Sequence, residues 1–406
     1  MTDLKIGERS ITLPFVNEQV QEIRHVEPEL NMSTDAFDIK LSDYFKEIEL
    51  IDFNVLIVIA DKTRLCEYNL YLPVLENYLK TRKVKNIQFI IAYGNHKPQN
   101  QKECIKSYGE IYDKSVFIHP DSSKTEDYIN IGRTTRGTQV DVRNELFQAD
   151  LVITFGAVSH HYFAGYGGGR KLIFPGLAYQ KSIYQNHSLF LDKKNGTLHE
   201  KCLSGVLEDN PVAEDLREID EMLPPRVSIY GILDSKGKVC NLEIGDIYFD
   251  FKRICKEYDK NFTFSGATQY DIVVASCGGY PKDINFIQAH KSIHNAASFV
   301  KDKGSLIIYA ECIDGIGSDT FLPYFEMGYD RAFKLLADHY EGNGGTALAM
   351  MEKVQRIDIY MVTSLDQNVC EVMGVKKIDE EKAIKKMDIN NKVIAVLPTA
   401  GLIIKK

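Results

Sequence analysis

The sequence lacks the closely spaced cysteines that a structural metal site or a redox centre usually needs. Eight cysteines are spread along the chain, and no two of them form a C-x-x-C pair. A zinc ribbon and a cysteine-held iron–sulfur cluster therefore have no local support. We interpret the cysteines as buried, reduced thiols.

Long apolar runs and an excess of positive charge are also absent. Strongly apolar runs such as residues 54–60 have the length of a strand and fall far short of a membrane span. Residues 1–15 carry charges throughout and show no signal-peptide core, so we expect a cytoplasmic protein without a membrane partner. The formal net charge of −8 disfavours general nucleic-acid binding, which needs a basic face.

Short apolar runs alternate with longer amphipathic segments, and this alternation is typical of an α/β fold. We expect strands at residues 54–60, 86–94 and 151–159, and helices at residues 69–82 and 98–109. Continuous Val, Ile and Leu runs between helices indicate mainly parallel strands that are covered on both faces.

A second set of elements begins near residue 270. We expect strands at residues 271–276, 304–312 and 357–365, a helix at 283–300, largely helical structure over 330–356, and a hairpin at 227–246 between the two sets. A chain of 406 residues is long enough for two domains. We therefore predict an N-terminal domain over 1–265 and a C-terminal domain over 266–390. Whether the segment 391–406 returns to the first domain stays open.

Polar and glycine-rich segments follow four of the predicted strands, at residues 61–64, 95–98, 160–171 and 277–283. In open parallel sheets, ligands bind beyond the carboxyl ends of the strands. We therefore expect these segments to converge on an active site in a cleft between the two domains.

The segment HYFAGYGGGRKLIFPG, residues 161–176, places four glycines before Arg170 and Lys171. A Walker motif needs glycine before the lysine and Ser or Thr after it, but Arg170 and Leu172 stand in those places. The dinucleotide fingerprint fails in both possible registers. A general anion cradle of exposed N–H groups and a flexible surface turn both remain possible for this segment.

The segment 161–171, together with His187, resembles the motif of the nickel-dependent lactate racemase family. That motif has a histidine, two aromatics, Ala-Gly, an aromatic, and then small-Gly-Gly-Arg-Lys, with a further histidine on the next helix. DKTR at residues 61–64 resembles the family's D-x-T-R. GGYPKDINFIQAHK resembles its G-G-x-P-x-D…Q-x-x-K and ends in Gln288 and Lys291. The resemblance covers most of the chain in order.

The resemblance implies a cofactor in the cleft, namely nickel held by a pyridinium-3,5-dithiocarboxylate-type mononucleotide, the nickel pincer nucleotide. It implies that Lys171 carries the mononucleotide covalently and that His187 binds nickel. It also implies cofactor contacts from Asp61, Gly167, Gly168, Gly169 and Arg170, with glycines because side chains would collide with the cofactor. Asp61 is a candidate for orienting either a histidine or the cofactor. Enzymes that synthesise the cofactor and insert nickel are the implied partners.

The implied activity is racemisation or epimerisation at C2 of a small 2-hydroxy acid. His96 and His161 become the catalytic pair, because a neutral histidine can take the hydroxyl proton of either enantiomer. The C2 hydrogen would leave as a hydride, which a pyridinium accepts and no side chain does. Arg64, Gln288 and Lys291 are the candidates that hold the substrate carboxylate.

Two other classes of function stay open at this point. One is a non-catalytic protein that retains an anion or cofactor site, and the other is a zinc-type hydrolase that uses the scattered histidines. Ile287 stands where lactate racemases commonly have Tyr, and Gly167 where Ser is frequent. Lactate, a larger hydroxy acid and a sugar acid are therefore alternative substrates. His160 is either a satisfied surface residue or part of the site, and we interpret His290 and His294 as structural or exposed.

Overall fold

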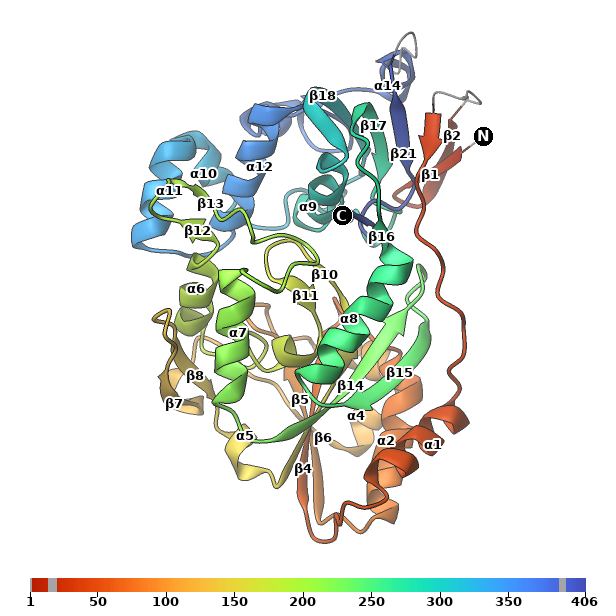
Figure 1. The fold of residues 1–406 in the computed structure, drawn as a ribbon, viewed down its shortest axis with the longest axis vertical. Helices are drawn as coiled ribbons and strands as arrows, with labels where there is room; N and C mark the ends of the chain where they lie inside the picture. Colours follow the sequence, from red (N-terminus) through yellow and green to blue (C-terminus); the bar gives the residue numbers. More distant parts are fainter. Residues whose placement is uncertain (1, 14–19, 387–391) are drawn as a thin grey trace. The chain divides into compact units, whose positions relative to one another are not determined.

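The computed structural model describes residues 2–13, 20–386 and 392–406, and the chain divides into two compact units (Figure 1). Unit 1 consists of Met1–Val26, Phe190–Glu200 and Asn261–Lys406, and unit 2 of Glu27–Leu189 and Lys201–Lys260. Each unit is built around its own six-stranded sheet.

The sheet of unit 2 has the strand order β15-β14-β9-β4-β5-β6. Its strands are β4 (Asn54–Ala60), β5 (Asn86–Ala92), β6 (Val116–Ile118), β9 (Leu151–Ala157), β14 (Arg226–Leu233) and β15 (Val239–Gly245). All neighbours pair in parallel except β14 and β15, which form the antiparallel hairpin expected at 227–246. The prediction of a mainly parallel α/β sheet is therefore confirmed for this unit.

The other elements of unit 2 are helices and short hairpins. They are α1 (Thr34–Phe45), α2 (Tyr68–Thr81), α3 (Gln101–Tyr108), α4 (Ile111–Lys114), η1 (Thr125–Asp127), β7 (Tyr128–Arg133), β8 (Gln139–Arg143), α5 (Glu145–Gln148), β10 (Ser159–His161), β11 (Gly165–Gly167), η2 (Gly169–Leu172), α6 (Gln180–Ser188), α7 (Pro211–Glu221) and α8 (Phe249–Phe262). The helix expected from residue 98 begins at Gln101, because Asn100 caps it. The Asn100 side chain accepts from the Glu103 N–H, and the Glu103 carboxylate accepts from the Asn100 N–H.

The sheet of unit 1 has the strand order β20-β19-β18-β17-β21-β3, with every pair parallel. Its strands are β3 (Val20–Glu22), β17 (Tyr270–Ser276), β18 (Val300–Tyr309), β19 (Asp358–Val362), β20 (Lys376–Lys377) and β21 (Ile394–Leu397). The unit also contains β1 (Thr2–Ile6), β2 (Arg9–Leu13), β12 (Leu191–Asp192), β13 (Thr197–Leu198), β16 (Thr263–Phe264), α9 (Phe286–Ala297), α10 (Leu322–Met327), α11 (Tyr329–Asp338), α12 (Gly344–Arg356), α13 (Gln367–Val372), α14 (Glu380–Lys386) and β22 (Ile404–Lys405). This sheet is again α/β and parallel, as predicted.

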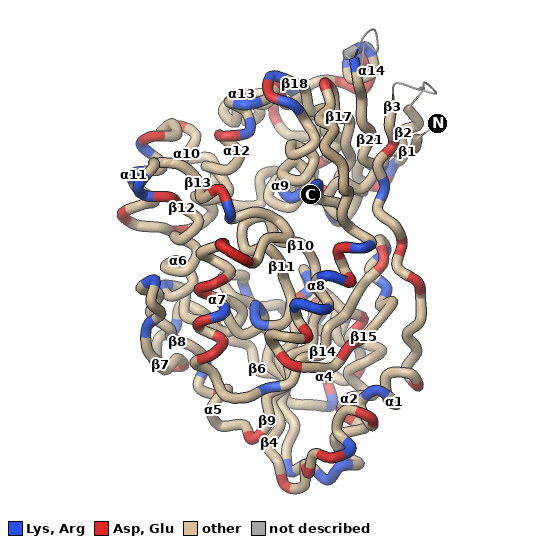
Figure 2. The backbone as a smooth tube through the Cα atoms, viewed as in Figure 1, with Lys and Arg blue, Asp and Glu red and all other residues tan. Residues whose placement is uncertain are grey.

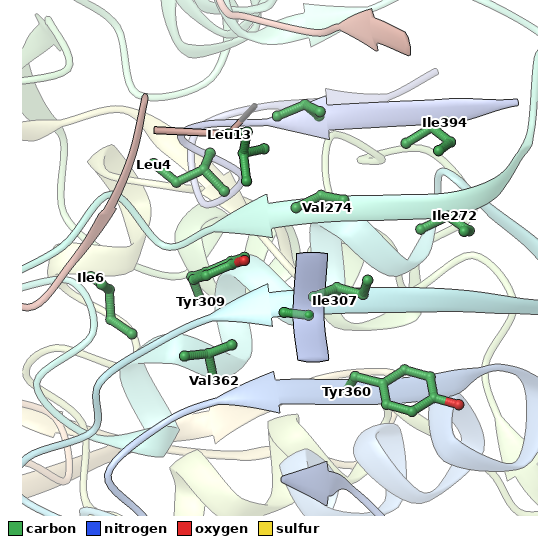
Figure 3. Close-up of a cluster of buried hydrophobic side chains, with 12 residues drawn as sticks. Leu4, Ile6, Leu13, Ile272, Val274, Ile307, Tyr309, Tyr360, Val362 and Ile394 are labelled. Carbon is green, nitrogen blue, oxygen red and sulfur yellow. The ribbon is translucent and has the colours of Figure 1, made fainter. Parts of the chain in front are cut away.

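The N-terminal hairpin of β1 and β2 buries its apolar side chains against the sheet of unit 1. Leu4, Ile6 and Leu13 share a core with residues of β17, β18, β19 and β21 (Figure 3). Removing these side chains from water stabilises the docking of the hairpin by the hydrophobic effect. The first 26 residues therefore belong with the C-terminal sheet.

This arrangement differs from the domain limits expected from the sequence, which placed residues 1–265 together. The short strand β3 pairs with β21, and β21 pairs with β17, so 1–26 and the described residues from 392 onward both join unit 1. The hairpin of β12 and β13 joins unit 1 as well, where the Leu198 N–H donates to Glu352 at 3.2 Å. Residues 387–391, around the expected limit at 390, lie outside the described residues.

The charged residues and the cysteines lie where the sequence leads us to expect them. Figure 2 shows acidic and basic residues interspersed along the elements of both units. All eight cysteines are buried and unbridged, which confirms their interpretation as buried thiols. Among the described residues, no helix combines the length and the apolar character that crossing a membrane requires.

The buried hydroxyl of Tyr68 joins two strands of unit 2 at their carboxyl ends. It accepts from the N–H of Ala60, the last residue of β4, at 2.9 Å and donates to the carbonyl of Phe155 in β9 at 2.7 Å. Burial holds the pKa of this phenol well above its usual value, so the hydroxyl stays protonated and keeps its proton to donate. The end of β4 is thereby fixed.

We expect Tyr68→Phe to lower the free energy of unfolding by about 2 kcal/mol, because it leaves the buried Ala60 N–H without an acceptor. Tyr71→Phe is the matched control, since the Tyr71 hydroxyl on the same helix makes only a long 3.4 Å contact with the Met32 carbonyl. Urea denaturation followed by circular dichroism measures both variants. An equal loss in the two variants would contradict the role given to Tyr68.

Candidate active site

The candidate site of unit 2 lies at the carboxyl ends of β9, β4 and β5, which are neighbours in the sheet. Asp61 follows β4 directly, and His96 lies in the loop after β5. The hairpin of β10 and β11, with His161 paired to Gly165, follows β9. Because parallel strands present their carboxyl ends at one edge, these residues come from the edge where ligands bind in such sheets.

Asp61 and His96 form a hydrogen-bonded pair. The His96 Nδ1 and the Asp61 Oδ2 are 2.6 Å apart, and Asp61 also accepts from the N–H and the hydroxyl of Thr63. Asp61 is 4% exposed, whereas the His96 side chain is 50% exposed. Burial alone raises the pKa of the Asp61 carboxyl, but His96, Thr63 and Arg64 together bring the pKa below its usual value. Asp61 is therefore ionised at neutral pH.

This pair fixes the tautomer of His96. An ionised carboxylate can only accept, so the proton of a neutral His96 lies on Nδ1 and its Nε2 is a proton acceptor. The negative charge of Asp61 also stabilises the imidazolium that forms when Nε2 takes a proton. Asp61, which the sequence suggested as a partner for a histidine or the cofactor, thus contacts His96.

The buried ring of Phe163 lies among three of the predicted site residues. The ring of His161 packs edge-on against it at 4.6 Å, and the ring of His187 does so at 5.0 Å. The Lys171 Nζ lies 5.6 Å from the centre of the same ring. Phe163 therefore fixes the relative placement of His161, His187 and Lys171. The aromatic pair in the motif is the one sequence signal for Phe163, and it provides no reason to assign this residue a role.

Burial favours the neutral forms of Lys171 and His187. Burial lowers the pKa of Lys171 well below its usual value, and the charges of Arg64 and Arg170 lower it further. Burial and the charge of Lys171 lower the pKa of His187 to about 3. Within the described part of the chain, the buried Nδ1 of His187 makes no hydrogen bond of acceptable geometry. A neutral amine is a nucleophile, and a neutral imidazole is a metal ligand.

The protein's own backbone and side chains already account for the glycines at 168 and 169, and contact of the motif glycines with a cofactor stays a prediction. Gly168 and Gly169 have φ of +83° and +50°, which favour glycine. A Cβ on Gly168 would lie 2.6 Å from the Ala157 carbonyl, and one on Gly169 would lie 2.8 Å from the Tyr230 ring. A Cβ on Gly167 would lie 3.2 Å from the Ser159 hydroxyl, which is a tight contact. Collision with the protein itself therefore requires glycine here.

Arg170 and Lys171 are consecutive in the sequence, but their side chains pack against different aromatic rings. The Arg170 guanidinium is buried over the ring of Phe251, 5.2 Å from its centre, and burial lowers its pKa to about 10. The exposed Arg64 acts electrostatically on both Asp61 and Lys171. Contact of Arg170 with a cofactor and of Arg64 with a substrate stay predictions.

Gln288 and Lys291 lie in unit 1, on α9. The Lys291 Nζ donates to the Gln288 Oε1 at 2.6 Å, so the two side chains share a face of the helix, as their spacing predicts. Asn285 caps the helix by accepting from the Gln288 N–H. That these residues and those of unit 2 act in one cleft stays a prediction.

Three further histidines, His160, His290 and His294, have structural surroundings. His160 is not a surface residue, because its side chain is 4% exposed and its Nε2 lies 2.9 Å from the Asp259 carboxylate on α8. His290 is buried and its ring lies 6.2 Å from that of His294. Residues 2–13, 20–386 and 392–406 contain no cluster of three His, Cys, Asp or Glu side chains that could hold a metal ion. The zinc-type hydrolase therefore has no ligand set in those ranges.

We predict that Lys171 reacts with an amine reagent such as acetic anhydride at a lower pH than exposed lysines do. Its lowered pKa leaves more of the nucleophilic amine at neutral pH. Arg64→Gln should move the midpoint of the Lys171 labelling profile to higher pH, because it removes a nearby positive charge. Peptide mass spectrometry measures the profile, and Arg133→Gln on exposed β7 is the control. A midpoint that is unchanged by Arg64→Gln would contradict the electrostatic coupling.

Comparison with known proteins gives consistent matches along the chain. The model of the lactate racemase N-terminal domain matches residues 7–198, and that of the lactate racemase C-terminal domain matches residues 266–398. The chain is 31% identical over 279 residues to the lactate racemase of Thermoanaerobacterium thermosaccharolyticum, covering 68% of this chain and 64% of the relative. It is 29% identical over 284 residues to the lactate racemase of Lactiplantibacillus plantarum, covering 69% of this chain and 65% of the relative.

Solved structures show the same fold. The lactate racemase apoprotein from T. thermosaccharolyticum matches with a TM-score of 0.89 at 26% identity, over 100% of this chain and 99% of that chain. A protein from Thermotoga maritima matches with a TM-score of 0.73 at 17% identity, over 94% of this chain and 100% of that chain, which shows the fold alone. With both family models matched in order over most of its length, the chain belongs to the lactate racemase family.

Proposed function

We propose that this protein inverts C2 of a 2-hydroxy acid, either lactate or a larger hydroxy acid. One observation carries the proposal. The Asp61–His96 pair and His161 follow the neighbouring strands β4, β5 and β9 of one sheet, and His187 and Lys171 pack with His161 around the ring of Phe163. The names of the curated relatives, both lactate racemases, support the same activity.

The residues present fit the nickel pincer nucleotide expected from the family resemblance. Lys171 offers an amine whose neutral, nucleophilic form burial favours, beside the ring of Phe163. His187 offers a neutral imidazole whose buried Nδ1 makes no hydrogen bond of acceptable geometry in the described part of the chain. When bound, this group supplies an electron-poor acceptor for the C2 hydrogen. Loading would need the enzymes that make the cofactor and insert nickel.

The hydrogen bonds of the two proposed catalytic histidines favour different tautomers of the neutral rings. His96 carries its proton on Nδ1 toward Asp61, so its Nε2 accepts the hydroxyl proton of one enantiomer. The Nδ1 of His161 accepts from the Ala164 N–H at 3.3 Å, so the proton of a neutral His161 lies on Nε2. To return a proton to the oxygen of the opposite enantiomer, His161 must itself be an imidazolium, because a neutral ring that gave up its only N–H proton would become an imidazolate. In the other direction His161 accepts the proton and His96, as the imidazolium, returns it.

The substrate carboxylate would be held by cationic and amide groups. Arg64 has the planar fork that matches a carboxylate, and its exposed side chain is available for such a contact. Gln288 and Lys291, which share a face of α9, are the proposed second set of carboxylate contacts. Ile287 at the neighbouring position is smaller than the Tyr that is common in lactate racemases, and this favours a substrate with a side chain larger than a methyl group.

We predict that a 2-hydroxy acid deuterated at C2 is inverted with its deuterium retained, and that inversion in heavy water incorporates almost none at C2. His96→Ala and His161→Ala should each slow inversion in both directions by about 10²–10⁴-fold, since each inversion needs a proton acceptor and a proton donor. Chiral chromatography with mass spectrometry measures both. His339→Ala, at an exposed site, is the control.

Rapid exchange of the C2 hydrogen with solvent would contradict the hydride route and leave the fold unaffected. Full activity of either histidine variant would contradict the catalytic pair.

We also predict that Lys171 and His187 have separable roles in cofactor loading. After expression with the cofactor-making enzymes, Lys171→Ala should lose the covalent adduct, whereas Lys181→Ala, at an exposed position of α6, should keep it. His187→Ala should lose nickel while the organic adduct on Lys171 persists. Intact-protein mass, peptide mapping and metal analysis measure these outcomes. An adduct on Lys181, or unchanged nickel in His187→Ala, would show that the assignment is wrong.

A further inference from the structure

Asp61 and His96 are brought together from two separate loops. Asp61 begins the loop at residues 61–64 after β4, and His96 lies in the loop at residues 93–100 after β5. A hydrogen bond of 2.6 Å between them requires that the two loops keep a fixed separation. Exposed loops have considerable conformational freedom, so a further contact must hold them together.

Gln99 makes such a contact. It is 7% exposed and lies at the end of the second loop. Its side-chain Oε1 accepts from the backbone N–H of Lys62, the residue after Asp61, at 2.8 Å. Its own backbone N–H donates to the hydroxyl of Tyr93, at the start of the same loop, at 3.1 Å. Gln99 therefore bonds to the first loop and closes the second.

The remaining polar groups around Gln99 fix its orientation. The Tyr108 hydroxyl lies 3.1 Å from the same Oε1 and 3.0 Å from the carbonyl of Ala60. The Gln99 Nε2 donates to the Ser107 hydroxyl at 3.2 Å. Only the amide oxygen of Gln99 can accept from the Lys62 N–H. One orientation of the Gln99 amide therefore satisfies both its oxygen and its nitrogen.

We propose that Gln99 is a positioning residue that holds the loop of Asp61 against the loop of His96, and so keeps Asp61 within hydrogen-bond range of the His96 Nδ1. Gln99 contacts no substrate and acts through Asp61. The positioning of Asp61 by Gln99 does not depend on the proposed function, whereas the transfer of the substrate proton by the Asp61–His96 pair rests on it. A neutral amide suits the position, because a carboxylate there would add a second negative charge close to buried Asp61.

Hydrogen exchange of the unloaded protein tests the contact directly. Gln99→Met removes the acceptor at nearly constant size, and we expect the Lys62 amide to exchange about tenfold faster or more, the effect of losing one net hydrogen bond. Gln99→Glu keeps an acceptor and should keep this amide protected. Gln101→Met, at an exposed position on α3, is the matched control and should leave it unchanged.

The consequence for His96 is measured by NMR on the same unloaded variants. In the wild type, the His96 Nδ1 proton should give a downfield, slowly exchanging signal because it is bonded to a buried carboxylate. Gln99→Met should broaden or remove that signal, and Gln101→Met should retain it. A retained signal together with a protected Lys62 amide in Gln99→Met would overturn the proposal.

Activity of the loaded enzyme separates positioning from general stability. We expect Gln99→Met to lower kcat about tenfold or more with little change in KM, because a misplaced proton acceptor slows the reaction without weakening carboxylate binding. An unchanged kcat would overturn the positioning role. If the loaded wild type inverts no 2-hydroxy acid, the proposed function fails, while the exchange and NMR results still decide on Gln99.

Discussion

The buried carboxylate of Asp61 is the constraint on which the rest of the site depends. A negative charge that is 4% exposed must be compensated by hydrogen bonds and nearby positive charge, or it would be protonated. Thr63 supplies two donors, and His96 supplies a third at 2.6 Å. Compensating this charge therefore also sets the orientation of His96. The same bonds that keep Asp61 ionised make His96 a proton acceptor at Nε2.

The charges beyond Asp61 are mostly positive and act on one another. Arg64 and Arg170 both disfavour the protonated form of Lys171, and Lys171 disfavours the protonated form of His187. In their neutral forms, the Lys171 amine can act as a nucleophile and the His187 imidazole can bind a metal ion. A bound anion would reduce the electrostatic repulsion between the positive charges of Arg64 and Arg170. A substrate carboxylate or a nucleotide phosphate has the required sign. These four side chains of unit 2 thus favour an anionic ligand beside them, although the whole chain carries a net charge of −8.

The sequence predicted the elements whose signals are local. Residues 54–60 and 151–157 are continuous apolar runs, so they could be recognised as buried parallel strands, and the polar residues after them marked the edge of the sheet. The three-residue strand β3 and the hairpin of β12 and β13 were missed, because their places depend on partners far along the chain. Phe163 and Gln99 were missed for the same reason. An aromatic residue or a glutamine has no signature in sequence for the rings or N–H groups that it will contact.

Strand geometry gives different surroundings to the two adjacent histidines that the sequence could not distinguish. Consecutive residues of a strand point to opposite faces, so β10 presents His160 and His161 in opposite directions. His160 is paired across the hairpin with Tyr166, and the Asp259 carboxylate bonds both side chains, at 2.9 Å and 2.7 Å. One face of the hairpin is thereby fixed to α8. His161, on the other face, packs against Phe163 with His187, so anchoring the first histidine orients the second toward the proposed chemistry.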